Sequence, residues 1–154
     1  MQKPRYVRAN ALAFVIPAVL LGGALGSQYI GGLYPCEMCH WQRWPHYAAL
    51  VIALVAFWLK PPMKPVLVAL AALAVLTSGA IGVFHAGVEY HWWNGITACT
   101  STAGGTSLED LLRAPLIRCD AAQWTLGGIS LAGFNAIFSI LGGLAVLVMV
   151  KRAS

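Results

Sequence analysis

Long uncharged stretches divide this chain of 154 residues into segments. Asp, Glu, Lys and Arg are absent from residues 9–36, 44–59, 65–88 and 121–150. A helix that crosses a membrane needs about 20 mostly apolar residues, and in that form a chain satisfies its own backbone hydrogen bonds in lipid. The pattern therefore predicts four transmembrane helices, at about 10–32, 41–59, 65–85 and 125–150. The second stretch, residues 44–59, is long enough to cross the membrane only if its helix begins before Arg43.

The composition supports a membrane protein, because 59% of the residues are hydrophobic and 10% are charged. A soluble domain carries about 25% charged and 45–50% apolar residues, and a disordered chain combines low hydrophobicity with high charge. Both classes are therefore excluded. We expect residues 1–154 to form a single all-α membrane domain, a four-transmembrane-helix bundle with two loops on its outer side.

The formal net charge of +5 at first suggests a nucleic-acid-binding protein. With four spans, however, both termini and the turn at 60–64 lie on one side of the membrane. That side carries basic residues and no acidic one, namely Lys3, Arg5, Arg8, Lys60, Lys64, Lys151 and Arg152. The positive-inside rule makes this side cytoplasmic. The excess of basic residues therefore indicates how the chain is oriented in the membrane, and no nucleic-acid partner is expected.

The N-terminus has a second interpretation. Basic residues, an apolar run and Ala24-Leu25-Gly26 together resemble a secretory signal peptide. The apolar run is longer than the usual core of such a peptide, which favours a retained helix. Cleavage would leave three spans and the same two outer loops.

All four cysteines, Cys36, Cys39, Cys99 and Cys119, fall in the two outer segments. In a bacterial inner membrane these segments are periplasmic, where disulfides persist. Four cysteines allow three pairings, which the sequence leaves open. The CxxC of Cys36 and Cys39 is typical of a redox-active pair with a lowered thiol pKa, although structural disulfides and zinc sites also use this spacing.

The surroundings of the CxxC motif favour redox chemistry. Pro35 precedes the motif and an apolar helix follows, so we expect Cys39 in or near the first helical turn. Unpaired N–H groups and the positive end of the helix dipole stabilise a thiolate there. Arg43 lies four residues later on the same face and adds a positive charge. Alternatively, Arg43 is an interfacial anchor whose side chain reaches the headgroups.

The second outer loop is predicted to carry a short amphipathic helix. Thr106-Ser107-Leu108-Glu109 fits a capping box, and Leu108, Leu111 and Leu112 follow on one face. Such a helix would lie on the membrane surface between Cys99 and Cys119. A disulfide that closes this loop would be exposed and labile.

The residues around the first cysteine pair resemble a known family. Pro35-Cys36-Glu37-Met38-Cys39-His40-Trp41-Gln42-Arg43 is similar to the PCxLCxxQR signature of the DsbB (disulfide bond formation protein B) family, with Met38 in place of Leu. Cys99, Cys119-Asp120, Trp124 and the segment Gly127-Gly128-Ile129-Ser130-Leu131 follow in that family's order. The resemblance extends from Ala9 to Val150.

The resemblance implies a thiol oxidase of the inner membrane that passes electrons to a quinone, either ubiquinone or menaquinone. A periplasmic thioredoxin-fold carrier of the DsbA type would attack the second-loop disulfide and form a mixed disulfide with Cys99. Cys119 would then exchange with Cys36, leaving Cys39 as the thiolate that faces the quinone. Arg43 would lie near the quinone head group.

Other polar residues are open to two interpretations. His85, at the predicted outer rim of the third helix, is a candidate quinone-binding residue or an interfacial polar group, and His91 and Trp124 fit interfacial roles better. Asn135 and Ser139 are expected to form helix–helix hydrogen bonds. Three glycine pairs are expected at close helix contacts: Gly22-Gly23, Gly127-Gly128 and Gly142-Gly143.

The alternative function is a non-enzymatic membrane protein. Its cysteines would form structural disulfides, or Cys and His residues would bind zinc, which needs four ligands in tetrahedral arrangement. On the redox hypothesis, which we prefer, no metal is required.

Overall fold

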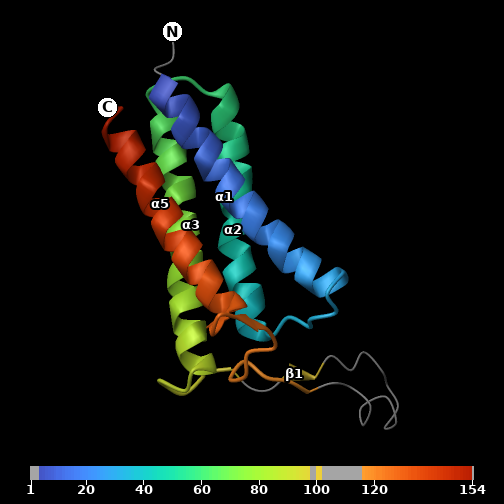
Figure 1. The fold of residues 1–154 in the computed structure, drawn as a ribbon. Helices are drawn as coiled ribbons and strands as arrows, with labels where there is room; N and C mark the ends of the chain where they lie inside the picture. Colours follow the sequence, from blue (N-terminus) through green and yellow to red (C-terminus); the bar gives the residue numbers. More distant parts are fainter. Residues whose placement is uncertain (1–3, 98–99, 102–115, 154) are drawn as a thin grey trace.

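Four long helices lie side by side in the part of the chain that the structure describes, residues 4–97, 100–101 and 116–153 of a computed structural model (Figure 1). The helices are α1 (Pro4–Tyr29), α2 (Glu37–Trp58), α3 (Met63–Glu89) and α5 (Leu131–Lys151). The predicted all-α architecture is therefore confirmed. The expected amphipathic helix after Thr106, like Cys99, lies outside the described residues.

Three of these helices, α1, α3 and α5, are long and apolar enough to cross a membrane. Each of them covers most of one of the three uncharged stretches that already had sufficient length in the sequence. The first turns of α2 carry His40, Arg43 and His46, so this helix is less apolar at its start. The fold is that of a helical membrane protein, and a fourth span through α2 remains a prediction.

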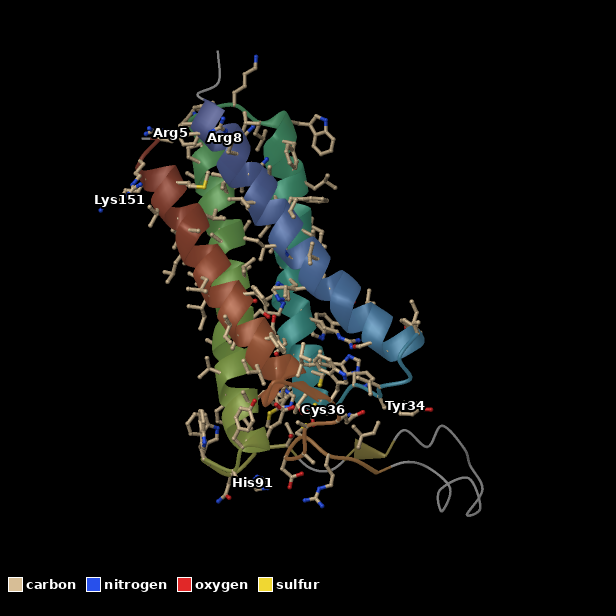
Figure 2. All side chains as sticks on the ribbon, viewed as in Figure 1. Arg5, Arg8, Tyr34, Cys36, His91 and Lys151 are labelled. Carbon is tan, nitrogen blue, oxygen red and sulfur yellow. The ribbon has the colours of Figure 1, made fainter. Side chains whose placement is uncertain are left out.

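Both termini lie at one end of the bundle, together with the turn between α2 and α3 (Figure 1). Arg5, Arg8 and Lys151 lie at this end, which we call the terminal end, whereas Cys36 and His91 lie at the opposite end (Figure 2). We call the latter the cysteine end. Three of the basic residues that the positive-inside rule assigns to the cytoplasm are thus separated from Cys36 by the length of the bundle.

The predicted start of the last helix at residue 125 is wrong. Residues before α5 form a small hairpin in which β3 (Thr125–Leu126) pairs with β4 (Ile129–Ser130). Gly127 and Gly128 connect the strands with φ values of 59° and 80°, a left-handed backbone that glycine adopts without steric cost. The Ser130 hydroxyl then accepts a hydrogen bond from the Gly133 N–H at 3.1 Å and caps α5.

The other helices also differ from their predicted bounds. The first helix begins at Pro4 and ends at Tyr29, with Pro17 inside it. The third helix continues to Glu89, so His85 lies within its last two turns rather than at its end. Helix termini depend on local capping, which the run of apolar residues does not show.

Small side chains form the main packed core. This cluster of buried residues consists of Ala9, Ala13, Ala49, Ala53, Ala56, Val68, Ala71, Ala72, Val75 and Val146. Gly142 and Gly143 also lie at close helix contacts, as predicted, since a Cβ on Gly143 would meet Leu76 at 2.7 Å. The same prediction is wrong for Gly22-Gly23, where an added Cβ would meet nothing within 4 Å, and for Gly127-Gly128, which forms the hairpin turn.

The second outer segment is partly described. Two short strands, β1 (Thr100–Ser101) and β2 (Leu116–Ile117), pair in antiparallel fashion with Thr100 opposite Ile117. This pairing holds the two ends of the intervening segment together at the cysteine end (Figure 1). Cys119 follows β2 by two residues and is buried.

Candidate functional site

The CxxC motif forms the start of α2. Cys36 is the N-cap residue, and its sulfur accepts a hydrogen bond from the Cys39 N–H at 3.3 Å. Cys39 therefore lies in the first helical turn, as predicted. The two Sγ atoms are 2.9 Å apart, and both thiols lie ahead of the predicted span 41–59. The local fold thus presents two sulfur atoms in direct contact at a helix N-terminus.

The two thiols differ in acidity. The hydrogen bond with Cys39, followed by burial, raises the pKa of Cys36, and the Cys119 side chain contributes in the same direction. The same hydrogen bond, now with Cys36 as donor, lowers the pKa of Cys39, whereas burial opposes this shift. Arg43 also lowers the pKa of Cys39, but it is the smallest of the causes. Cys39 is therefore the thiol that ionises first.

Cys119 lies beside the CxxC motif. It is buried in a small cluster with Cys36, Met38, Val88 and Ile117. Cys36, Cys39 and Cys119 are all free thiols in the described part of the chain. The fold thus brings a cysteine from the second outer segment to the first pair, across 80 or more positions of sequence.

His85 contacts the same pair from α3. Its Nε2 is 3.4 Å from the Cys36 sulfur and 3.7 Å from a Glu89 carboxylate oxygen. The Gln42 amide nitrogen donates to its Nδ1 at 2.7 Å and to the Met38 carbonyl at 3.3 Å. Because Nδ1 accepts a hydrogen bond, the proton of the neutral ring resides on Nε2, where it faces Cys36 and Glu89.

Arg43 is buried rather than extended to an interface. Its guanidinium donates to the Gln28 side-chain oxygen at 2.5 Å and to the Ala24 carbonyl at 3.1 Å. These bonds join α2 to α1 and hold the positive charge one turn beyond Cys39. Arg43 also lines the cavity described below, and its role in a site stays a prediction.

A cavity of about 620 Å³ lies between the helices at the cysteine end. Its polar lining includes Cys39, Arg43, His46 and His85, and Trp124 borders it. The rest of the wall is mostly apolar and includes Val15, Val19, Leu20, Phe134, Phe138 and Leu141. Val19 on α1 and Leu141 on α5 are 65% and 63% exposed. The cavity is therefore bordered by side chains that also face the surroundings of the bundle.

A buried polar network extends from the site into the bundle. The sequence indicated only its two members on α5, Asn135 and Ser139. The network consists of Gln42, His46, Ser78, Asn135 and Ser139. The Asn135 amide nitrogen donates to the Gln42 side-chain oxygen at 2.8 Å and to the Ser78 hydroxyl at 3.1 Å. The predicted helix–helix role of Asn135 and Ser139 is confirmed. The available signal was the recurrence of polar residues on one face of α2 at 39, 42 and 46.

Three possible metal ligands lie together in the described part of the chain. The ligand atoms of Cys36, Cys39 and His85 are all within 4.8 Å of one another. A structural zinc site normally has four ligands, so this group supplies three of them. The exposed His91 does not belong to it, and Trp124 packs against Phe134 with ring centroids 6.3 Å apart.

The fold and the site together define a helical membrane protein with a pair of contacting thiols, of which Cys36 is buried and Cys39 is half-buried. The family model described as disulfide bond formation protein DsbB matches residues 6–149, and the chain belongs to this family. Membership implies disulfide oxidoreductase activity.

Two relatives are similar to most of this chain, and the first of them carries the name of the family. Disulfide bond formation protein B of Marinobacter nauticus is 30% identical over 156 residues, which cover 93% of this chain and 91% of the relative. An uncharacterized protein of Rickettsia prowazekii is 24% identical over 147 residues, covering 91% and 85% of the two chains. No solved structure matches this chain.

Proposed function

We propose that this protein reoxidises a periplasmic dithiol carrier of the DsbA type and transfers the electrons to a quinone in the bacterial inner membrane. In this proposal the cysteine end faces the periplasm and both termini face the cytoplasm. The resemblance to the family motif suggested this function, and the charge distribution between the two ends supports the orientation.

The observation that carries the proposal is the cavity beside the dithiol. Its volume of about 620 Å³ falls in the range of about 300–1,000 Å³ that is usual for small-ligand pockets. Cys39, the thiol of lower pKa, lines this cavity, whereas a structural disulfide needs no adjacent cavity. The exposed apolar side chains at its border suit a ligand that arrives from lipid.

The donors and acceptors of the cavity fit a quinone head group. A quinone is a flat apolar ring with carbonyl oxygens, and when bound it accepts two electrons and two protons. The guanidinium of Arg43 has five N–H donors, of which the bonds to Gln28 and Ala24 use only part. Arg43 would hold a carbonyl oxygen, His85 would border the ring, and the apolar wall would bury the rest.

The cysteines have distinct parts in the proposed transfer. The carrier's thiolate attacks the disulfide of Cys99 and Cys119, and the resulting Cys119 thiolate attacks the Cys36 sulfur of a Cys36–Cys39 disulfide. The burial of Cys119 and Cys36 in one cluster supports this exchange. Cys39 leaves as a thiolate, stabilised by the helix N-terminus. The carrier's second thiolate then displaces Cys99 from the mixed disulfide, and the Cys99 thiolate attacks Cys119, which re-forms the Cys99–Cys119 disulfide and releases the Cys36 thiol. Oxidation of the Cys36–Cys39 dithiol back to the disulfide would then deliver two electrons and two protons to the bound quinone.

A metal site is the second candidate, because the ligand atoms of Cys36, Cys39 and His85 lie within 4.8 Å of one another. Zinc would bind these thiolates and block their oxidation. Metal analysis of the purified protein distinguishes the two functions, since a physiological zinc site would retain stoichiometric metal through purification.

The proposed function is tested with reduced protein in lipid discs that contain no quinone. We expect the free thiols to persist until quinone is added and then to disappear, two thiols for each quinone reduced. Cys39→Ser should abolish this reaction, while His40→Ser, an exposed neighbour in the same helical turn, should preserve it. Thiol loss without quinone, or full activity of Cys39→Ser, would contradict the proposal.

A further inference from the structure

His46 continues the polar face of α2 into the bundle. It lies seven residues after Cys39 and three after Arg43, on the same side of the helix. The rise of 1.5 Å per residue places it about 10 Å beyond Cys39 along the helix axis. His46 is only 3% exposed, and it lines the cavity. It therefore provides a polar group in the part of the cavity farther from the thiols.

Three oxygens around the His46 ring determine where its proton lies. Its Nε2 is 2.9 Å from Asn135 Oδ1, 2.9 Å from the Ser78 hydroxyl and 3.4 Å from the Ser139 hydroxyl. Ser78 donates its own proton to the Gln42 carbonyl at 2.7 Å, and Ser139 donates to Asn135 Oδ1 at 3.0 Å. All three oxygens therefore accept from Nε2, which must carry the proton.

The other ring nitrogen is left as an acceptor. With the proton on Nε2, Nδ1 of the neutral imidazole has a free lone pair. Nδ1 is buried and has no hydrogen-bond partner within the described ranges. A buried polar atom without a partner costs roughly as much as a lost hydrogen bond. The ring thus requires a donor that its helix neighbours do not supply.

We propose that His46 Nδ1 accepts a hydrogen bond from a ring hydroxyl of the reduced quinone, so that the cavity binds the hydroquinone more tightly than the quinone. This inference rests on the proposed function. A carbonyl oxygen only accepts hydrogen bonds, whereas a phenolic hydroxyl also donates one. Arg43 supplies donors near Cys39, and His46 supplies an acceptor two turns away from it.

The consequence is a bias in the direction of electron flow. A group that binds the reduced ligand more tightly stabilises it relative to the oxidised ligand, and the two binding equilibria are linked. His46 would therefore favour reduction of the bound quinone without contact with either sulfur. In this role His46 recognises the ligand, whereas Cys36 and Cys39 carry out the thiol–disulfide exchange.

The test measures binding to protein whose cysteines are kept reduced, so that a hydroquinone has no electron acceptor in the protein. The probes are an alkyl hydroquinone and its dimethyl ether, which keeps the ring and removes both hydroxyl donors. The wild-type protein should prefer the hydroquinone by on the order of tenfold in dissociation constant, the effect of one buried hydrogen bond.

Two variants isolate the acceptor. His46→Phe keeps an aromatic ring and should lose the preference for the hydroquinone over its ether. His40→Phe, a matched change at an exposed histidine of α2 outside the cavity, should retain it. A preference that survives in His46→Phe, or no preference in the wild type, would overturn the inference.

A measurement on the wild type covers the case in which His46→Phe does not fold. The nitrogen NMR signals of His46 should show the Nε2-protonated tautomer, and Nδ1 should shift on addition of the hydroquinone but not of the ether. An unshifted Nδ1 would refute the role of His46 and leave the proposed function standing. If neither quinone nor hydroquinone binds, the proposed function itself fails.

Discussion

The terminal end and the cysteine end of the bundle are stabilised in different ways. The large core cluster contains only alanine and valine, with members such as Ala9, Ala56 and Val146 near the termini. At the cysteine end, α1 diverges from α5 (Figure 1), and the cavity is lined by both helices. There the polar network joins α2, α3 and α5 through side-chain hydrogen bonds.

This difference follows from the physics of helices in lipid. Apolar side chains gain little from leaving lipid for a protein interface, so association depends on close backbone approach and on hydrogen bonds. Small residues permit the close approach. A cavity for a ligand prevents the helices from approaching closely. Hydrogen bonds between polar side chains then replace part of the lost packing. The polar network therefore has a structural role that accompanies any role in ligand binding.

The largest effect on stability is expected from Gly143→Leu in the packed region. A Cβ at Gly143 would meet Leu76 at 2.7 Å and the Ala72 carbonyl at 3.1 Å, so α3 and α5 must separate. Overpacking of this kind costs about 1–3 kcal/mol in the free energy of unfolding. Unfolding of the purified protein in mixed micelles by denaturing detergent measures the loss.

Gly22→Leu is the matched control, because a Cβ at Gly22 has no neighbour within 4 Å. This variant should be neutral or slightly stabilising, since leucine favours a helix by up to about 1 kcal/mol over glycine. If both variants lost the same free energy of unfolding, the close approach of α3 and α5 would not be what stabilises the packed region.

A smaller loss is expected from Asn135→Ala at the cysteine end. This change removes the donor to Gln42 and Ser78 and the acceptor for His46. Interhelical hydrogen bonds in membranes contribute about 0.6 kcal/mol on average and up to about 2 kcal/mol. We expect a loss of about 1 kcal/mol in the same unfolding assay. Ser139→Ala removes fewer bonds and should cost less, so the reverse order would contradict the proposed arrangement of the network.

The smallest effect on stability, and a clear effect on chemistry, is expected from Cys36→Ala. The pKa of Cys39 is lowered chiefly by its hydrogen bond with Cys36. In the wild type, the alkylation rate of reduced Cys39 should therefore rise at a lower pH than for an ordinary thiol. Loss of the Cys36 donor raises the pKa of Cys39. The midpoint of the pH profile of alkylation therefore moves to higher pH.

Arg43→Ala provides the comparison for this pH profile, because the charge of Arg43 is the smallest cause of the lowered pKa of Cys39. The midpoint should move less than in Cys36→Ala. A larger shift in Arg43→Ala would mean that the guanidinium charge, rather than the second thiol, controls the acidity of Cys39.

Several features followed from short-range patterns in the sequence. Uncharged stretches predicted the helices, and Pro35 followed by an apolar segment predicted the N-terminal placement of Cys39. These features depend on residues close together in the chain, so local pattern suffices. The last helix was predicted to start too early, at residue 125, because Gly127 and Gly128 carry no charge and do not interrupt the apolar stretch. In the structure these glycines adopt a left-handed turn geometry.

The cavity, the polar network and the approach of Cys119 to Cys36 depended on how the helices pack. His46 and Asn135 are 89 positions apart, and their contact requires a particular rotation of α2 against α5. Sequence periodicity shows that a helix has a polar face, but many rotations and separations bury such a face. Only the packed bundle selects one of them, because small residues set the helix separation and hydrogen bonds set the rotation.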